Sequence, residues 1–258
     1  MKIFLITDIN HGKNSNYPSL KGLEYINVYG EDYQKLIPIL KREMDSCDLV
    51  INLGDFILAE SEEKDREAYK EALNLLSTKT PIKHVAGNHD LRNLSRERWS
   101  LLAGEDSSYY SFDMGGYHHI VLNGNVTEPR GPYHISEKQL LWLEEDLKNT
   151  MHRTIVYAHH PLDKQSMDDN YYFKDKPERT SINNKYFVRR ILEKSEKVLA
   201  VFSGHTHFYN KEEIEGILYF TVPSFLENNG KHAPKAEYGI ALLERDRVTL
   251  SIKKVNVS

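Results

Sequence analysis

The chain has 258 residues, a formal net charge of −4 and a single cysteine. The negative balance and the lack of a dense Lys/Arg stripe in the sequence argue against a nucleic-acid partner, and one cysteine excludes an intrachain disulfide. The longest near-apolar stretch, residues 49–59, contains Asn52, Gly54 and Asp55, which excludes a membrane span there.

The apolar run after Lys2 is too short for the hydrophobic region of a secretory signal, and a single cysteine fits a reducing compartment. We therefore expect a cytoplasmic protein with no membrane partner. The length would allow two domains, but large α/β domains often reach this size, and no Pro/Gly/Ser-rich linker or repeat divides the chain. We predict a single domain over residues 1–258.

Apolar runs and helical patterns alternate up to residue 208. β-branched and aromatic content predicts strands at residues 2–7, 49–53, 82–86, 154–158 and 198–202. The spacing of apolar residues predicts helices at residues 32–46, 62–76, 136–148 and 183–194. Later strands are predicted at residues 217–222, 238–243 and 248–255. This order predicts an α/β fold in which helices flank two packed mixed sheets.

Each of the five early strands ends in residue types that bind metal ions. These residues are Asp8, Asp55, Asn88, His159 and the pair His205 and His207. In open α/β sheets, ligands bind at the carboxyl ends of the strands. Taken singly, the acidic and amide residues are equally well explained as helix caps or turn residues. Recurrence at five strand ends favours a metal site instead.

Five motifs together resemble the calcineurin-like metallophosphoesterase superfamily. They are Asp-x-Asn at 8–10, Gly-Asp at 54–55, Gly-Asn-His-Asp at 87–90, His-His-Pro at 159–161 and Gly-His-Thr-His at 204–207. The third and fifth motifs are highly specific in combination. The resemblance implies a four-layer αββα sandwich of two mixed β-sheets flanked by helices, with two divalent metal ions at the strand ends.

Seven metal ligands are implied by this resemblance, position by position. Asp55 matches the carboxylate that bridges both ions. His159 is preferred to His160 because the family ligand stands two residues before the proline. The first site would be completed by Asp8, Asn10 and His207, and the second by Asn88, His159 and His205.

The same resemblance implies catalytic and substrate-binding residues. His89 matches a histidine that contacts the phosphate and protonates the leaving group. Asp90 would orient His89 by accepting its ring proton. Asn88 of this motif is also a predicted substrate-binding residue. Arg92, Arg96 and Arg98 lie after the motif and any of them could reach a phosphate, and Arg92 is the one predicted to bind substrate.

The first motif departs from the family pattern, which is usually Asp-x-His, because this chain has Asn10. Oxygen-rich sites suit Mn²⁺ or Mg²⁺, whereas imidazole suits Zn²⁺ and Fe. We therefore favour Mn²⁺ as the cofactor, with Fe, Zn²⁺ and Mg²⁺ as alternatives. Whether Asn10 or His11 is the ligand stays open, although an extended backbone over residues 8–10 would turn the His11 side chain elsewhere.

The leading interpretation is a dinuclear metal-dependent phosphoesterase. It would hydrolyse a small soluble phosphate ester, either a phosphodiester or a nucleotide-like compound, with hydroxide generated between the metals. A nuclease of the same fold is an alternative that the net charge disfavours. A non-catalytic interaction subunit with a decayed metal site is another, and Asn10 is the feature that favours it. The sequence leaves substrate identity and oligomeric state open.

Two long segments without a regular pattern leave from metal-bearing strand ends, at residues 11–30 and 162–181. Segments of this length without secondary structure are uncommon in compact domains and often functional. We expect both to overhang the site. Their tyrosines either pack the segments onto the body of the protein or face the pocket, where they would stack on a nucleobase.

Overall fold

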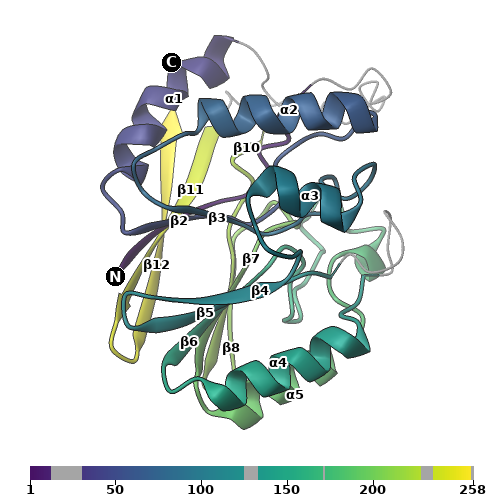
Figure 1. Ribbon diagram of the computed structural model, residues 1–258, viewed down its shortest axis with the longest axis vertical. Helices are drawn as coiled ribbons and strands as arrows, with labels where there is room; N and C mark the ends of the chain where they lie inside the picture. Colours follow the sequence, from purple (N-terminus) through teal and green to yellow (C-terminus); the bar gives the residue numbers. More distant parts are fainter. Residues whose placement is uncertain (13–30, 125–132, 171, 228–234, 257–258) are drawn as a thin grey trace.

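Figure 1 shows the computed structural model of the chain, in which residues 1–12, 31–124, 133–170, 172–227 and 235–256 are described. Most of the predicted loop at residues 11–30 lies outside the described residues. Two β-sheets lie face to face, with helices on the outer side of each sheet (Figure 1).

The first sheet joins strands from both ends of the chain in the order β10-β11-β1-β2-β3, with β12 paired to β11. The central strands β1, β2 and β3 are parallel, and β11 is antiparallel to β1, so the sheet is mixed. The strands are β1 (Lys2–Ile6), β2 (Leu49–Asn52), β3 (Ile82–His84), β10 (Leu226–Glu227), β11 (Lys235–Glu244) and β12 (Arg247–Asn256).

The second sheet has the order β4-β5-β6-β7-β9-β8. Its four central strands are parallel, while β4 and β8 form antiparallel edges that the sequence patterns did not predict. The strands are β4 (Tyr110–Met114), β5 (Tyr117–Leu122), β6 (Arg153–Ala158), β7 (Val198–Ser203), β8 (Asn210–Ile214) and β9 (Ile217–Thr221).

The helices are α1 (Glu31–Met44), α2 (Glu62–Leu75), α3 (Arg96–Ala103), α4 (Glu137–Asn149) and α5 (Lys185–Ser195), and a short 3₁₀ turn spans Pro177–Arg179. α1, α2 and α3 cover the first sheet, and α4 and α5 cover the second (Figure 1). α4 begins where the capping pattern predicts, because the Ser136 hydroxyl accepts from the Gln139 backbone N–H at 3.2 Å. In the described ranges, no helix combines the length and apolar character that a bilayer crossing requires.

Alternation along β1 shows how the four layers are held together. Ile3 and Leu5 face the second sheet and pack in a cluster with residues of β5, β6 and β7. Phe4 and Ile6 face the opposite way and pack in a cluster with residues of α1, α2 and α3. A third cluster joins the second sheet to α4 and α5. Full burial of one such side chain stabilises the fold by about 1.5–3 kcal/mol. The predicted four-layer αββα sandwich is confirmed.

Candidate metal centre

The structure brings the predicted metal ligands together where the two sheets meet. They follow β1 (Asp8, Asn10), β2 (Asp55), β3 (Asn88), β6 (His159) and β7 (His205, His207). Nε2 of His207 lies 3.3 Å from Oδ1 of Asp8. Nε2 of His159 lies 3.3 Å from Oδ2 of Asp55. The first sheet thus contributes carboxylates and amides, and the second sheet contributes imidazoles.

Five of these residues have a left-handed backbone. The φ angle is 52° at Asp8, 50° at Asn10, 51° at Asp55, 68° at His205 and 65° at His207. Residues other than glycine are uncommon in this region of φ/ψ space, and strained backbone clusters at functional sites. The concentration of such residues at three strand ends, those of β1, β2 and β7, points to a functional site at this edge of the sheets.

Two glycines let the ligand-bearing loops approach one another. A Cβ atom at Gly87 would lie 2.2 Å from Oδ1 of Asp55. A Cβ atom at Gly204 would lie 2.0 Å from Oγ1 of Thr7 and 3.0 Å from Oδ2 of Asp8. These distances are too short for any side chain, so the glycines before Asn88 and His205 are steric requirements of the cluster.

Asp8 is fully buried, and its two oxygens have different surroundings. Oδ2 accepts hydrogen bonds from Oγ1 of Thr7 at 2.6 Å and from the backbone N–H of His205 at 3.0 Å. Oδ1 faces the His207 ring and accepts no hydrogen bond from any described residue. Burial raises the pKa of Asp8, but the charge of His207, its close polar contact with Asp8 and the charge of His159 together outweigh burial, and the net shift is downward. Asp8 therefore presents an ionised oxygen to the centre.

Backbone carbonyls orient two of the imidazoles. Nδ1 of His159 donates to the carbonyl oxygen of Leu53 at 2.9 Å. Nε2 of His205 donates to the carbonyl oxygen of Arg179 at 2.7 Å. The tautomers assigned from these bonds leave Nε2 of His159 and Nδ1 of His205 as the atoms that can bind a metal.

The buried carboxylates attract positive charge to the centre. Burial raises the pKa of Asp55, but His159 and His89 outweigh burial and hold this pKa well below its usual value. Burial lowers the pKa of His159, but Asp55 and then Asp8 raise it to about 9. His159 thus carries a proton at the position where a metal ligand is predicted. Binding of a cation there would release this proton.

The donor atoms fit divalent cations in type and spacing. Ligand atoms of Asp8, Asp55 and His159 lie within 4.8 Å of one another. Oδ1 of Asn88 is buried and has no hydrogen-bond partner among the described residues. Leaving such an atom unsatisfied costs about 1–3 kcal/mol, which coordination of a cation would offset. Carboxylate, amide and imidazole donors suit Mn²⁺, Zn²⁺ and Fe.

His160 joins this cluster, although the sequence interpretation omitted it as a ligand. One of its nitrogens lies within 4.8 Å of donor atoms of His159 and His205. Its ring is fully buried, stacks on Tyr133 with centroids 3.6 Å apart, and has no hydrogen bond to any described residue. The sequence signal that could have found it is its position inside the His-His-Pro motif.

Asn10 and His11 differ in what their side chains contact. Nδ2 of Asn10 donates to the carbonyl oxygen of Asp8 at 3.1 Å, which leaves its amide oxygen as the atom that can bind a cation. Nε2 of His11 lies 3.2 Å from Oε2 of Glu71 on α2. The His11 side chain therefore engages α2, and Asn10 stays the proposed ligand. The expected extended backbone over residues 8–10 is wrong, because φ is 52° at Asp8 and 50° at Asn10.

The predicted contact between Asp90 and the ring of His89 is wrong. Oδ1 of Asp90 accepts from the backbone N–H groups of Phe56 and Ile57, at 2.9 and 3.2 Å. Oδ2 of Asp90 accepts from the backbone N–H of Gly87 at 2.9 Å. Backbone N–H groups beside a buried carboxylate are strong partners, and Asp90 uses them to join the loops after β2 and β3.

A backbone carbonyl orients His89 instead. Nδ1 of His89 donates to the carbonyl oxygen of Leu58 at 2.8 Å. The backbone N–H of His89 donates to Oδ1 of Asp55 at 2.7 Å, which holds the residue against the cluster. Nε2 of His89 lies 3.5 Å from Nη2 of Arg92. His89 therefore contacts both Asp55, through its backbone, and Arg92, through its ring.

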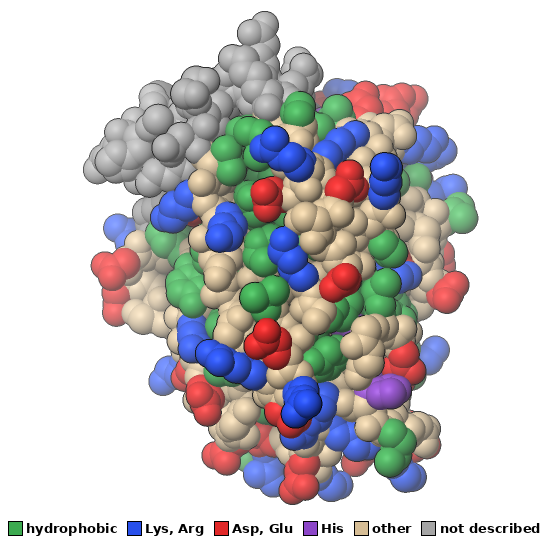
Figure 2. Space-filling view, turned by 90° about the vertical axis from the view of Figure 1, so that its left-hand side faces the viewer, with side chains coloured by type: hydrophobic (Ala, Val, Ile, Leu, Met, Phe, Trp, Pro, Cys, Tyr) green, Lys and Arg blue, Asp and Glu red, His purple; other side chains and the backbone are tan. Residues whose placement is uncertain are grey.

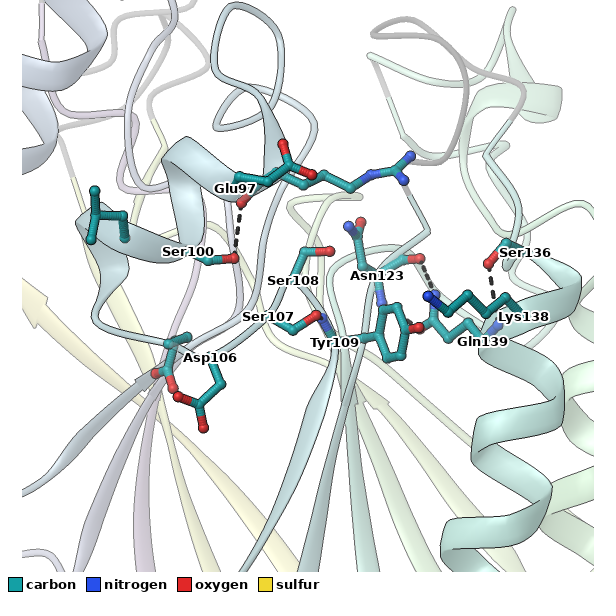
Figure 3. A pocket seen from close by; sticks show the side chains of 13 residues that line it. Glu97, Ser100, Asp106, Ser107, Ser108, Tyr109, Asn123, Ser136, Lys138 and Gln139 are labelled. Carbon is teal, nitrogen blue, oxygen red and sulfur yellow. Dashed lines mark hydrogen bonds between the residues drawn. The ribbon is translucent and has the colours of Figure 1, made fainter.

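A separate hollow of about 500 Å³ lies between the first turns of α3 and α4 (Figure 3). Its lining mixes polar and apolar surface and includes the side chains of Ser100, Leu101 and Tyr109. The predicted site residues, all of which the structure describes, do not line it. This hollow is therefore distinct from the candidate metal centre.

Comparison with protein families matches residues 1–209 to the calcineurin-like phosphoesterase family. One curated relative is serine/threonine-protein phosphatase CPPED1 of Homo sapiens, 33% identical over 153 residues, which are 55% of this chain and 46% of the relative. Another is acid phosphatase type 7 of Mus musculus, 27% identical over 197 residues, which are 70% of this chain and 45% of the relative. The chain spans about half the length of these curated relatives.

Solved structures share the fold over the whole chain. A dimetal phosphatase from Danio rerio superposes with a TM-score of 0.70 at 19% identity and covers 100% of this chain and 99% of that one. A purple acid phosphatase from yellow lupin (Lupinus luteus) superposes with a TM-score of 0.66 at 12% identity, covering 100% of this chain and 51% of that one. At these identities the similarity is one of fold.

Proposed function

The chain belongs to the calcineurin-like phosphoesterase family, and on this premise we propose that it is a dinuclear metal-dependent phosphoesterase acting on a small soluble phosphate ester. The observation that carries the proposal is the buried group of Asp8, Asp55 and His159, whose ligand atoms lie within 4.8 Å of one another. The curated relatives that match are named phosphatases, which supports phosphate ester hydrolysis. A phosphodiester or a nucleotide-like ester is the proposed substrate.

We assign the metal-holding roles to the seven predicted ligands. Asp55 would contact both cations, since it lies beside His159 and belongs to the same group of donor atoms as Asp8. Two divalent cations held here supply positive charge for the phosphate and lower the pKa of water at the site. The amide and imidazole ligands are neutral when they bind a metal, so they leave the centre with the net positive charge that attracts a phosphate.

His89 and Arg92 would act on the substrate side of the centre. The guanidinium of Arg92 can pair with phosphate oxygens, and planar Arg groups suit this contact. His89 donates its Nδ1 proton to Leu58, so its Nε2 donates to an ester oxygen only when the ring is protonated. Burial and Arg92 lower the pKa of His89 despite the opposing charge of Asp55, so His89 would take up the proton that a poor leaving group needs only when the anionic ester binds beside it.

Surface charge supports a small substrate over a nucleic acid. Lys and Arg side chains are interspersed with Asp and Glu over the face shown in Figure 2. The formal net charge of −4 agrees with this mixed pattern. A protein that follows a polyanion uses clustered basic residues, so the nuclease alternative is disfavoured.

A panel of p-nitrophenyl phosphate, bis(p-nitrophenyl) phosphate and single-stranded DNA tests the proposal. Protein reconstituted separately with Mn²⁺, Zn²⁺, Fe²⁺ and Mg²⁺ should hydrolyse one or both small esters and leave the DNA intact. Faster hydrolysis of the diester would support the diesterase assignment. Bound metal with no hydrolysis of any ester would favour the non-catalytic interaction subunit.

The role of His89 is tested by His89→Ala. We expect kcat for an alkyl phosphate ester to fall about 10²-fold, because proton transfer contributes this much to typical reactions. The loss should be smaller for p-nitrophenyl esters, whose leaving group needs no proton. Metal content should match that of the unchanged protein, and loss of a whole metal equivalent would contradict a substrate-side role.

A further inference from the structure

The segment after β6 is fixed to the loop that carries two proposed ligands. The buried side chain of Asn170 donates from Nδ2 to the carbonyl oxygen of Thr206 at 2.8 Å. Its Oδ1 accepts from the backbone N–H groups of Tyr172 and Phe173, at 3.1 and 3.0 Å. Asn170 therefore sets the position of two aromatic residues relative to His205 and His207. The prediction that residues 162–181 overhang the site agrees with this contact.

The two aromatic side chains lie on two different imidazoles. The Phe173 ring is 5.0 Å from the His205 ring, and Phe173 is 4% exposed. The Tyr172 ring is nearly parallel to the His207 ring, with an angle of 16° and centroids 6.0 Å apart, yet Tyr172 is 38% exposed. Phe173 already packs the segment onto the metal centre, so packing alone does not account for an exposed ring at Tyr172.

Further exposed aromatic surface follows directly after His207 in the chain. Phe208 is 37% exposed and Tyr209 is 49% exposed. Exposed aromatic surface has a hydration cost of about 25 cal/mol per Å² of apolar area, and contiguous exposed apolar surface marks binding sites. We define the aromatic rim as Tyr172, which lies on the His207 ring, together with Phe208 and Tyr209, which follow His207 directly in the chain.

Two arginines lie beside the proposed centre. Nη2 of Arg92 lies 3.5 Å from Nε2 of His89, and the backbone carbonyl of Arg179 accepts from Nε2 of His205 at 2.7 Å. Arginine groups suit a phosphate, whereas the aromatic rim suits an uncharged, flat group next to that phosphate.

We propose that the substrate is a phosphate ester that carries an aromatic ring, and that Tyr172 is the specificity-determining residue on which this ring stacks. The inference rests on the proposed function and narrows its substrate class. A nucleobase and a simple aryl group share the required chemistry. Stacking of a base on an aromatic side chain contributes enough to change relative affinity about tenfold.

Two pairs of esters separate stacking from leaving-group chemistry. Adenosine 5′-monophosphate and ribose 5-phosphate share a primary alkoxide leaving group and differ in the base. 2-Phenylethyl phosphate and n-butyl phosphate also share a primary alkoxide and differ in the aryl ring. Each is assayed as the monoester and as its methyl diester. The measured quantity is the ratio of kcat/KM for the ring-bearing ester to that for its ring-free partner.

Tyr172→Ala should lower this ratio about tenfold through KM, and Tyr172→Phe should preserve it because the ring is kept. Tyr186→Ala is the matched control, since Tyr186 is 58% exposed on α5 and belongs to no proposed site. Metal content and thermal unfolding of each variant show whether the fold is retained.

If Tyr172→Ala lowers the kcat/KM ratio only for the nucleotide pair, the ring that stacks on Tyr172 is a nucleobase. If it lowers the ratio only for the aryl pair, that ring is a simple aryl group. An unchanged ratio in Tyr172→Ala for both pairs would overturn the inference while leaving the proposed function intact. If the unchanged protein hydrolyses no ester with any metal, the proposed function fails, and the inference fails with it.

Discussion

Asn10 is the residue at which this chain departs from the motif pattern that it otherwise follows. Its side chain donates to the Asp8 carbonyl, so the oxygen of the amide is the atom left for a cation. An amide oxygen is a harder and weaker donor than an imidazole. The first proposed site should therefore hold its metal less tightly than the imidazole-rich second site.

Replacing Asn10 with His tests this difference. Activity of metal-stripped protein should recover best with Mn²⁺, and Asn10→His should shift the preference toward Zn²⁺ or Fe by strengthening the first site. Asn10→Ala should weaken Mn²⁺ binding only modestly, about tenfold or less, because Asp8, Asp55 and His207 stay in place. Coincident Mn²⁺ titration curves for all three proteins would mean that Asn10 is not a ligand.

For single residues, the sequence predicted which positions carry the proposed ligands better than it predicted the side-chain contacts among them. The proposed ligands could be located because each follows an apolar strand, and the structure brings them together. The partner of Asp90 could not be predicted, because it depends on how the loops after β2 and β3 fold over one another. The place of His160 under Tyr133 could not be predicted for a related reason, since it depends on packing that no local pattern encodes.

Among the structural elements, the loop after β7 has the strictest steric requirement. A Cβ atom at Gly204 would meet Oγ1 of Thr7 at 2.0 Å, so this loop would have to move away from Asp8. We expect Gly204→Ala to lower the free energy of unfolding by about 1–3 kcal/mol, as overpacking typically does, and to weaken metal binding. Gly216→Asn is the control, because nothing lies within 4 Å of the Cβ position there and Asn tolerates the left-handed φ of 76°. Equal metal content in both variants would contradict this account.

His118 on β5 joins its strand to β4 and to helix α4. Nδ1 of His118 on β5 lies 2.6 Å from Oδ1 of Asp113 on β4, and Nε2 lies 2.8 Å from Oδ2 of Asp146 on α4. Burial lowers the pKa of His118, but the hydrogen bonds to Asp146 and Asp113 outweigh burial and the net shift is upward. The native state therefore favours the protonated ring more than the unfolded state does.

The upward shift of the His118 pKa on folding predicts that the stability of the protein depends on pH. The contribution of His118 should be complete below its unfolded pKa of about 6.5 and should be lost as pH rises through the higher folded value. His118→Gln should cost about 1–2 kcal/mol in the free energy of unfolding at pH 6, and the cost should shrink toward pH 9. Urea denaturation at both pH values measures this, with exposed His152→Gln as the control. If His118→Gln lowers the free energy of unfolding by the same amount at both pH values, the charge of His118 does not contribute to stability.

The elements themselves were predicted unevenly. The buried parallel strands that were predicted and the longer helices have strong apolar patterns, and their bounds agree with the observed ones to within a few residues. β4 and the buried parallel strand β5 were not predicted. β8 was missed because its sequence, NKEEI, has one apolar residue and pairs at a sheet edge. α3 was missed because it has only eight residues and a weak apolar face.

At the scale of the whole molecule, two mixed sheets converge so that carboxylates of one face imidazoles of the other. This convergence could be predicted as a fold class from the order of strands and helices and from the motif resemblance. The contacts between the sheets at the site, such as Asp8 with His207 and Asp55 with His159, required the structure. The central claim is that these residues together hold two metal ions.

Metal analysis of protein purified without a chelator and supplemented with Mn²⁺ tests this claim most directly. We expect about two metal ions per chain in the unchanged protein and less than about one in Asp55→Ala, because Asp55 is the ligand proposed to serve both sites. Asp163→Asn, which alters another buried carboxylate outside the cluster, should keep the full metal content. Fewer than about one ion per chain in the unchanged protein, or full occupancy in Asp55→Ala, would contradict the dinuclear centre.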